Sequence, residues 1–171
     1  MEAPKYALFE HERRFLVRPV DAPDLSGAPA RLIEDRYLDG RLRLRAVTDL
    51  ATGARTFKLC KKYPSDDAVS GPITNLYLAP EEHAALMALP GAAIRKRRYS
   101  LSHAGRRWGL DVFEGEITGL MLAEIEAESR AAVLTAPIPP WAAREVTGEP
   151  FFTGGVLCRA SAQALTERLA V

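Results

Sequence analysis

Short segments in which polar and apolar residues alternate run through most of this chain. Residues 42–45 read Leu-Arg-Leu-Arg, and Glu10, Glu12 and Arg14 fall on one face of another such segment. A period of two is typical of β-strands, because successive side chains of a strand point to opposite faces. We therefore expect strands at residues 6–17, 31–38, 40–47, 55–61, 73–78, 93–103, 108–114 and 120–129.

The period changes to that of a helix in two places. The first helix is expected over residues 79–89, where Pro80 stands at the start and Glu81 and Glu82 follow in the first turn. The second is expected over residues 155–169, which are rich in Ala and Leu. Strands and helices do not alternate as in a parallel fold, so the sequence predicts an α+β fold with a large antiparallel sheet. A sheet of about eight strands tends to curl or close, which removes its edges.

Length and charge exclude several classes of protein. The 171 residues suit one domain, which we expect to span residues 1–171. Lys and Arg number 23 against 22 Asp and Glu, whereas general nucleic-acid binders carry a clear basic excess. No apolar run approaches the roughly 20 residues that a membrane helix requires. The sparse cysteines, Cys60 and Cys158, favour reduced thiols. We therefore expect a cytoplasmic protein with no membrane contact and no specific nucleic-acid partner.

Acidic residues recur in pairs two positions apart. Glu10 and Glu12 share a face of one predicted strand, and Glu124 and Glu126 share a face of another, while Asp111 lies in a further alternating segment. Neighbouring carboxylates repel one another unless a cation or a basic group lies between them. Mg²⁺ and Mn²⁺ prefer carboxylate oxygens and often complete their shells with substrate phosphates. The pairs therefore indicate either a solvated face or a site for a hard divalent cation.

Basic residues are sorted in the same way. Arg43 and Arg45 share one strand face, about 6.5–7 Å apart, and Lys96 and Arg98 share another. On any single strand this pattern also fits a solvated outer face. Arginine can bind phosphate through two parallel N–H groups, and lysine binds it as a point charge. Together with the carboxylates, the basic residues indicate a site for a metal and a polyanion; they are Arg14, Arg43, Arg45, Lys58, Lys96 and Arg98.

These segments follow one another in an order that resembles a known superfamily. Residues 10–17, Glu-His-Glu-Arg-Arg-Phe-Leu-Val, resemble the Glu-x-Glu-x-Lys strand of the CYTH superfamily, also called triphosphate tunnel metalloenzymes. The resemblance is strongest at residues 110–115 and 122–126, and it continues through residues 36–38, 42–45, 57–58, 95–100, 139–141 and 145–147. It implies a closed eight-stranded antiparallel β-barrel, the tunnel, with helices packed outside.

The resemblance also implies roles for individual residues. Members of the superfamily bind inorganic triphosphate or nucleoside triphosphates with Mg²⁺ or Mn²⁺. By position, the metal ligands would be Glu10, Glu12, Glu124 and Glu126, and Asp111 would lie near the metals or orient the basic groups. These five residues form the expected catalytic set. The expected phosphate ligands are Arg14, Arg43, Arg45, Lys58, Lys96 and Arg98.

Three features depart from the superfamily pattern. Arg14 replaces the final lysine of the signature, which keeps the charge but changes the reach of the side chain. Residues 73–77, Ile-Thr-Asn-Leu-Tyr, carry no acidic pair where many members have one. Residues 151–155, Phe-Phe-Thr-Gly-Gly, lack the basic residues that relatives often have near the C-terminus. One end of the tunnel is therefore expected to be less charged.

The resemblance and the residues together predict a metal-dependent hydrolase of inorganic triphosphate, short polyphosphate or another triphosphate-bearing small molecule. An adenylate cyclase using the same site is one alternative, although no adenine pocket is evident. A non-catalytic sensor of polyphosphate or nucleotides is the other, suggested by the missing acidic pair and the missing basic segment near the C-terminus. A homodimer is left open.

Overall fold

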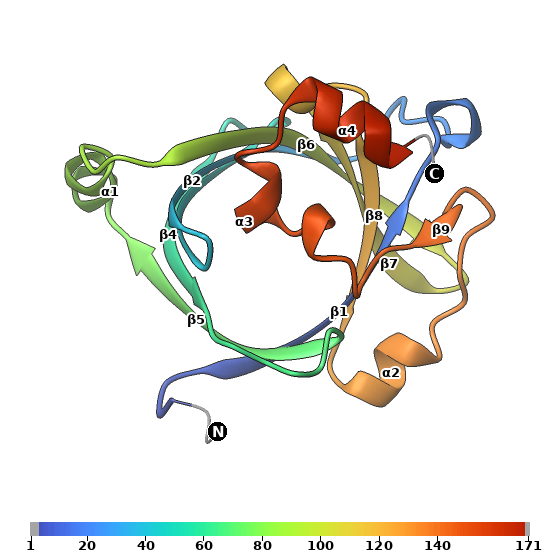
Figure 1. Ribbon diagram of the computed structural model, residues 1–171, viewed down its shortest axis with the longest axis horizontal. Helices are drawn as coiled ribbons and strands as arrows, with labels where there is room; N and C mark the ends of the chain where they lie inside the picture. The colour runs from blue at the N-terminus through green and yellow to red at the C-terminus, as the bar shows by residue number, and fades with distance from the viewer. Residues whose placement is uncertain (1–3, 170–171) are drawn as a thin grey trace.

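Eight antiparallel strands close into a barrel in the computed structural model, which describes residues 4–169 (Figure 1). Neighbours around the barrel follow the order β1-β5-β4-β3-β2-β6-β7-β8, and β8 pairs with β1 to complete the ring. The α+β class and the closed eight-stranded barrel predicted above are confirmed. The strands are β1 (Leu8–Leu16), β2 (Ala30–Asp39), β3 (Leu42–Asp49), β4 (Arg55–Lys62), β5 (Ser70–Leu78), β6 (Ala92–His103), β7 (Arg106–Phe113) and β8 (Met121–Ala127). The short β9 (Arg144–Glu145) pairs with the end of β1.

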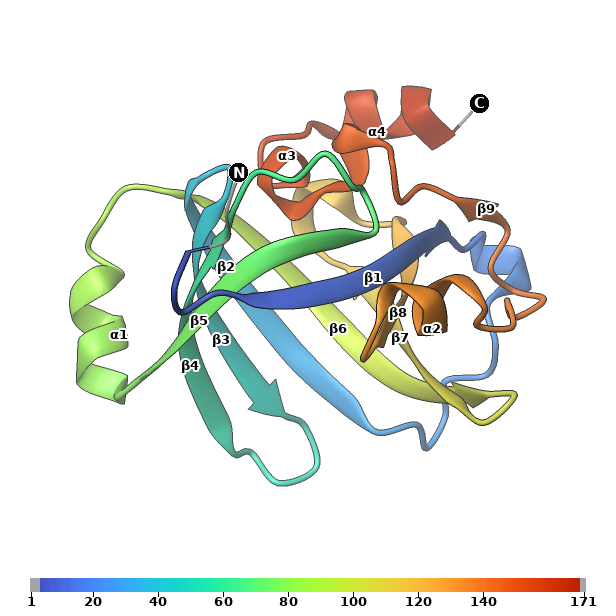
Figure 2. The ribbon, with the colours of Figure 1, turned by 90° about the horizontal axis from the view of Figure 1, so that it is seen from below.

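Most of the helices lie outside the barrel, as expected. Figure 2 shows α1 (Pro80–Leu86) and α2 (Arg130–Leu134) on opposite outer sides, where α1 contacts β4 and β5 and α2 contacts β1 and β8. The helix α3 (Gly154–Leu157) differs, because it lies across one end of the barrel within the outline of the ring (Figure 1). In the part of the chain that the structure describes, 3₁₀ turns lie at Pro19–Asp21, Gly115–Ile117 and Pro150–Phe152.

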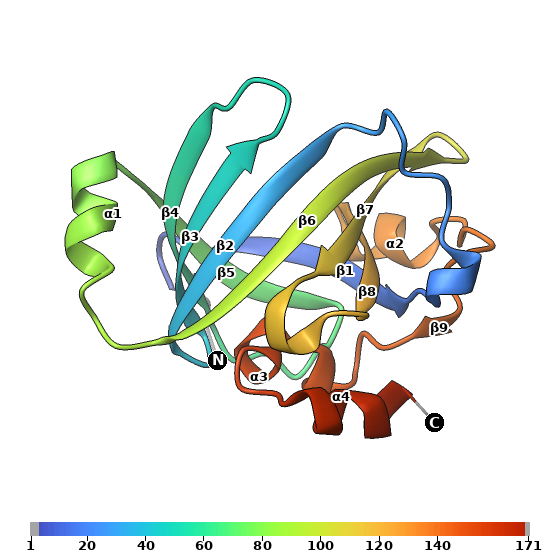
Figure 3. The same ribbon diagram turned by 90° about the horizontal axis from the view of Figure 1, so that it is seen from above.

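The continuous helix expected over residues 155–169 is wrong. Residues 154–157 form α3, and a separate helix, α4 (Ala162–Leu169), begins after a break. The hydroxyl of Ser161 accepts a hydrogen bond from the Ala164 amide (3.2 Å) and thereby caps the start of α4. The break turns α4 away from the barrel opening, and Figure 3 shows it beside the end of the barrel where α3 lies.

The hydrophobic core is divided into two clusters. One cluster fills the end covered by α3 and includes Tyr37, Phe113, Phe152 and Leu157. A second cluster lies near α2 and packs Phe15, Trp108 and Val133 together. Members of the first cluster, such as Phe113 and Leu157, line the same cavity as the charged strand faces.

Two smaller findings concern the thiols and the helices. Cys60 and Cys158 are both free, as the sequence suggested. Within residues 4–169, the helices are all too short or too polar to cross a membrane.

Candidate active site

The register between β1 and β8 brings the two carboxylate pairs together. Glu12 lies directly opposite Glu126, and Arg14 lies directly opposite Glu124. Directly opposed residues of an antiparallel pair point to the same face, and here that face is the barrel interior, because all four residues line a cavity there. The two Glu-x-Glu segments, more than a hundred residues apart in sequence, thus form one acidic wall.

The facing strands supply the basic wall. Arg43 and Arg45 come from β3, and Lys96 and Arg98 come from β6. All four line the same cavity as the carboxylates. The alternation of each strand explains why, since residues two apart share a face. The solvated outer face that the sequence left open is therefore not where these residues lie.

Two cavities adjoin within the barrel. One has a volume of about 630 Å³ and contains the basic wall. The other, about 520 Å³, lies toward the loop between β4 and β5 and the C-terminal segment that includes α3. Both are lined by Glu10, Glu12, Arg14, Arg43 and Lys62. The boundary between the cavities therefore carries two carboxylates and three cations.

Arg14 is the hub of the acidic wall. Its guanidinium donates to Glu124 Oε1 (2.9 Å), to Glu12 Oε1 (3.0 Å) and to the Phe152 carbonyl (3.1 Å). Burial alone would lower the pKa of Arg14, but the Glu12 and Glu124 carboxylates outweigh burial and raise that pKa. The arginine that replaces the signature lysine thus joins three segments, whereas an ammonium group would not match this planar geometry.

Asp111 holds the basic wall in place. It is fully buried and accepts hydrogen bonds from Lys96 and from Arg98, whose Nε lies 2.6 Å from Asp111 Oδ1. Arg98 also pairs with Glu124. Burial lowers the pKa of Lys96, and the cations of Arg98 and Arg45 lower it further. Asp111 therefore lies behind the cavity lining and orients two of its cations.

The carboxylates of the acidic wall differ in whether a cationic side chain neutralises their charge. Burial would raise the pKa of Glu124, but Arg98, Lys96 and Arg14 outweigh burial and lower that pKa well below its usual range. Glu126 makes no ion pair with any residue in the range 4–169. Burial, together with the charges of Glu10 and Glu12, raises the pKa of Glu126. Negative charge thus remains uncompensated where the two Glu-x-Glu segments meet.

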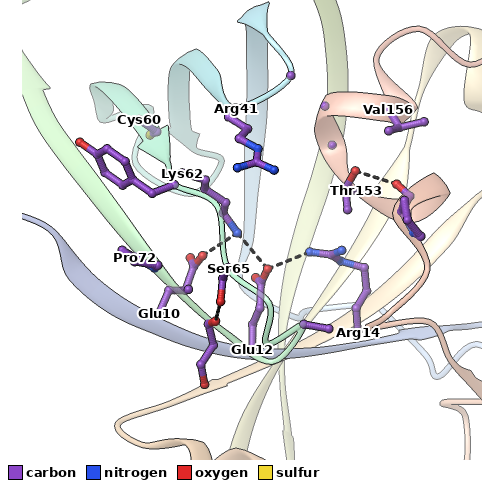
Figure 4. A pocket seen from close by; sticks show the side chains of 18 of the residues that line it. Glu10, Glu12, Arg14, Arg41, Cys60, Lys62, Ser65, Pro72, Thr153 and Val156 are labelled. Carbon is purple, nitrogen blue, oxygen red and sulfur yellow. Dashed lines mark hydrogen bonds and ion pairs between the residues drawn. The ribbon is translucent and has the colours of Figure 1, made fainter. Parts of the chain in front are cut away.

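Lys62 and Asp35 are among the charged residues of the interior that were missed in the sequence. Lys62 Nζ lies 2.6 Å from Glu10 Oε2 and 2.9 Å from Glu12 Oε1 (Figure 4). Asp35, which is buried, accepts two hydrogen bonds of 2.7 Å from Arg45. Both could have been found from the period of two, because Lys62 shares a strand face with Lys58, and Asp35 pairs in register with Arg45.

Lys58 is the predicted phosphate ligand that is not brought to either cavity. It lies directly opposite Arg45 in the sheet, but its ammonium group sits 4.7 Å from the centre of the Tyr77 ring.

Arg43 has one hydrogen-bond donor without a partner among residues 4–169. Its Nη1 donates to the Tyr37 hydroxyl (2.9 Å), while its buried Nε has no hydrogen-bond partner in the described part of the chain. A buried unsatisfied donor is costly, so a ligand oxygen would be favoured there.

The donor chemistry of the acidic wall fits Mg²⁺ or Mn²⁺. Carboxylate oxygens are the ligands these cations prefer. The carboxylates of Glu10 and Glu12 lie close enough to Glu126 to raise its pKa. As the side chains stand, however, no three His, Cys, Asp or Glu groups of residues 4–169 converge closely enough to hold a metal. Arg14, Arg98 and Lys62 occupy their oxygens instead.

Comparison with known proteins identifies the architecture. No protein-family model matches the chain. A 66-residue stretch is 41% identical to an inorganic triphosphatase of Acetivibrio thermocellus, and it covers 39% of this chain and 41% of that relative. The match therefore spans about two fifths of the relative's length.

Solved structures match over a larger part of the chain. The inorganic triphosphatase NE1496 is 27% identical, with 88% of this chain and 95% of that chain covered and a TM-score of 0.58. A candidate adenylate cyclase of Bacillus halodurans is 16% identical, with 75% and 86% covered and a TM-score of 0.52, and so speaks only for the fold. The closed barrel, with its acidic and basic walls inside, and the similarities to these solved structures point to the same fold. The chain has the triphosphate tunnel fold of the CYTH superfamily.

Proposed function

We propose that this chain is a metal-dependent triphosphatase that hydrolyses inorganic triphosphate or another triphosphate-bearing small molecule. The observation that carries the proposal is the pairing of the two Glu-x-Glu segments, with Glu12 opposite Glu126, across one cavity from Arg43, Arg45, Lys96 and Arg98. A polyanion and a divalent cation are the two ligands that such opposed walls suit. The relatives named inorganic triphosphatase support the same reading.

Each wall has a distinct task in this proposal. Arg43, Arg45 and Arg98 bind phosphate oxygens, and the buried Nε of Arg43 has no hydrogen-bond partner among the described residues. Glu10, Glu12, Glu124 and Glu126 are proposed to hold the cation. Bound Mg²⁺ or Mn²⁺ would supply positive charge to the phosphate oxygens and lower the pKa of a water molecule.

The uncompensated Glu126 is proposed to orient the attacking water. Its carboxylate, which has no cationic partner among the described residues, can accept a hydrogen bond from the water and direct it in line at the terminal phosphorus. Asp111 acts behind the lining, because it fixes Lys96 and Arg98 toward the cavity. Most of the phosphate ligands are thus positioned before the substrate arrives, which is how electrostatic catalysis avoids reorganisation.

Phosphate release is the test. The purified chain is assayed with triphosphate, longer polyphosphate, ATP and thiamine triphosphate, each with Mg²⁺ and with Mn²⁺. We expect metal-dependent release with at least one substrate, and its loss in the Glu10→Ala/Glu12→Ala variant. The absence of phosphate release from all four substrates, in a folded protein, would refute the proposal.

A binding protein without turnover is the second candidate. The observation that favours it is Asn75, which pairs in register with Cys60, a residue of the cavity lining, at a strand where relatives often carry an acidic pair. It predicts tight triphosphate binding in calorimetry with no phosphate release. Formation of cyclic AMP in the ATP reaction would instead identify an adenylate cyclase.

The remaining parts of the proposal rest on the sequence. We propose a single functional unit over residues 1–171 that acts in the cytoplasm on a small-molecule substrate. The choice between Mg²⁺ and Mn²⁺ is decided by the same assay. A homodimer stays a prediction for sedimentation measurements.

A further inference from the structure

We infer that Lys62 is a positioning residue that sets the affinity of this site for a divalent cation. Its ammonium group lies between Glu10 and Glu12, in the place that the cation would take, and metal binding displaces it toward the substrate. The inference rests on the proposed function for the metal site and adds a residue that neither the signature segment nor the basic set contains.

The geometry is that of one cation bridging two carboxylates. Lys62 Nζ lies 2.6 Å from Glu10 Oε2 and 2.9 Å from Glu12 Oε1. Figure 4 shows the ammonium of Lys62, a residue of β4, pointing between these two side chains. Arg14 donates to the same oxygen, Glu12 Oε1, at 3.0 Å. A divalent cation placed beside two monovalent cations at such distances would be strongly repelled, so one of them must leave.

Lys62 is the one that can move. Its side chain is 36% exposed, whereas that of Arg14 is 10% exposed. Arg14 is also held by Glu124 and the Phe152 carbonyl, while the Lys62 ammonium pairs with Glu10 and Glu12 alone among the described residues. Lysine has a flexible four-carbon stem and a point charge with no fixed plane. The ammonium can therefore rotate away without breaking the rest of the network.

The displaced ammonium remains inside the barrel. Lys62 lines both cavities, so a rotation about its side-chain bonds leaves the charge beside bound phosphate rather than in bulk solvent. The same charge would then oppose metal binding in the free protein and favour substrate binding in the metal-bound protein. Metal and substrate would consequently bind with positive coupling, since each one favours the same position of Lys62.

The test measures Mn²⁺ binding without substrate, by the electron paramagnetic resonance signal of free Mn²⁺. Lys62→Met should bind Mn²⁺ about tenfold more tightly than the wild type, the effect of about 1.4 kcal/mol. Lys61→Met is the matched control, because it makes the same change of charge one residue away on the other face of β4. Lys61→Met and the charge-preserving Lys62→Arg should both remain close to the wild type.

Two further measurements keep the outcomes separate. Circular dichroism checks that each variant is folded, and Lys62→Gln replaces Lys62→Met if the latter is not. At saturating Mn²⁺, a raised KM for triphosphate with a small change in kcat would report the second position of the ammonium. Mn²⁺ affinity equal to that of the wild type, or no Mn²⁺ binding in any variant, would overturn the inference.

The proposed function stands or fails separately. If the wild type releases phosphate but Lys62→Met binds Mn²⁺ no more tightly than the wild type, the proposed function is supported and the inference about Lys62 is refuted. If the wild type shows no turnover but Lys62→Met binds Mn²⁺ more tightly than the wild type, the inference about Lys62 is supported and the proposed hydrolase activity is refuted.

Discussion

Buried acids position the basic residues of the barrel. Asp35 fixes Arg45 through two hydrogen bonds of 2.7 Å, and Asp111 fixes Lys96 and Arg98. Buried ion pairs contribute little net stability, because the cost of removing both charges from water offsets their attraction. Removing one partner is different, since it leaves a buried charge alone. These acids therefore matter for the direction in which the cations point.

The titration of Asp35 makes this testable. Burial would raise its pKa, but Arg45 and Arg43 outweigh burial and lower the pKa to about 2. Because the folded pKa lies below the usual value of about 3.9, the ionised form stabilises the fold above about pH 4. That stabilisation, about 2.5 kcal/mol, is lost as the pH falls through about 2.

Urea titrations between pH 6 and pH 2 measure this contribution. The free energy of unfolding of Asp35→Asn should lie below that of the wild type at pH 6, and the difference should shrink by about 2 kcal/mol on acidification to pH 2. Asp66→Asn, in an exposed loop, removes the same charge and should follow the wild type. A constant difference between wild type and Asp35→Asn at every pH would contradict the assigned ion pair.

The period of two gives the strand faces of Lys62 and Asp35, but no local signal shows which side chains they contact. Glu10 and Glu12 stand out because a two-residue spacing is visible in the chain itself. Lys62 is fifty residues from Glu12, and only the closure of the barrel, through β5, brings the two side chains together. Lys58 lies on the expected strand face, but its ammonium group does not reach the cavity. Strand faces can be predicted from spacing, but contacts across the barrel depend on closure.

At the scale of elements, the strands and the helix α1 were predictable, whereas α2 and the break between α3 and α4 were not. A strand shows its two faces within a few residues, so a period of two survives in the sequence. The five residues of α2 are too few for a helical period, and an isolated helix of that length is not stable in water. Its stability comes from Val133, which is fully buried, and from Ser129, whose hydroxyl accepts from the Ala132 amide at 3.1 Å.

Removing the cap of α2 should destabilise the protein by a modest amount. Ser129→Ala leaves an amide of the first turn without its partner, and loss of such a cap costs about 1 kcal/mol. Urea denaturation measures the change in the free energy of unfolding. Ser102→Ala makes the same deletion on an exposed strand position and should stay within about 0.5 kcal/mol of the wild type. Equal effects of the two substitutions would mean that the hydroxyl of Ser129 does not cap the helix.

On the scale of the whole molecule, the barrel is polar inside and closed at one end by an apolar segment. Phe152 and Leu157, both almost fully buried, pack with Tyr37 at that end. The expectation that the helices pack outside the barrel therefore holds for α4 but not for α3, which lies across the barrel end. The Phe152 carbonyl also accepts a hydrogen bond from Arg14 (3.1 Å), so the segment that closes the barrel touches the acidic wall directly.

This closure depends on the absence of a side chain at Gly155. A Cβ there would lie 2.0 Å from the Gly40 carbonyl oxygen, a backbone atom of the turn between β2 and β3 that cannot move aside cheaply. Gly155→Ala should therefore push residues 154–157 away from the barrel end and lower the free energy of unfolding by about 1–3 kcal/mol. The displaced segment should also expose the Cys158 amide, which now donates to the Gly154 carbonyl (3.1 Å).

Hydrogen exchange measured by mass spectrometry separates displacement from general destabilisation. In Gly155→Ala, exchange should accelerate over residues 150–158 before it changes in the strands, and the loss of the Phe152 carbonyl as a partner should free Arg14. Gly148→Ala is the matched control, because the nearest atom to a Cβ there, on Ala68, is 4.0 Å away. Acceleration that is uniform over the chain, or equal in the two variants, would show that the fit of Gly155 against Gly40 does not hold the barrel end closed.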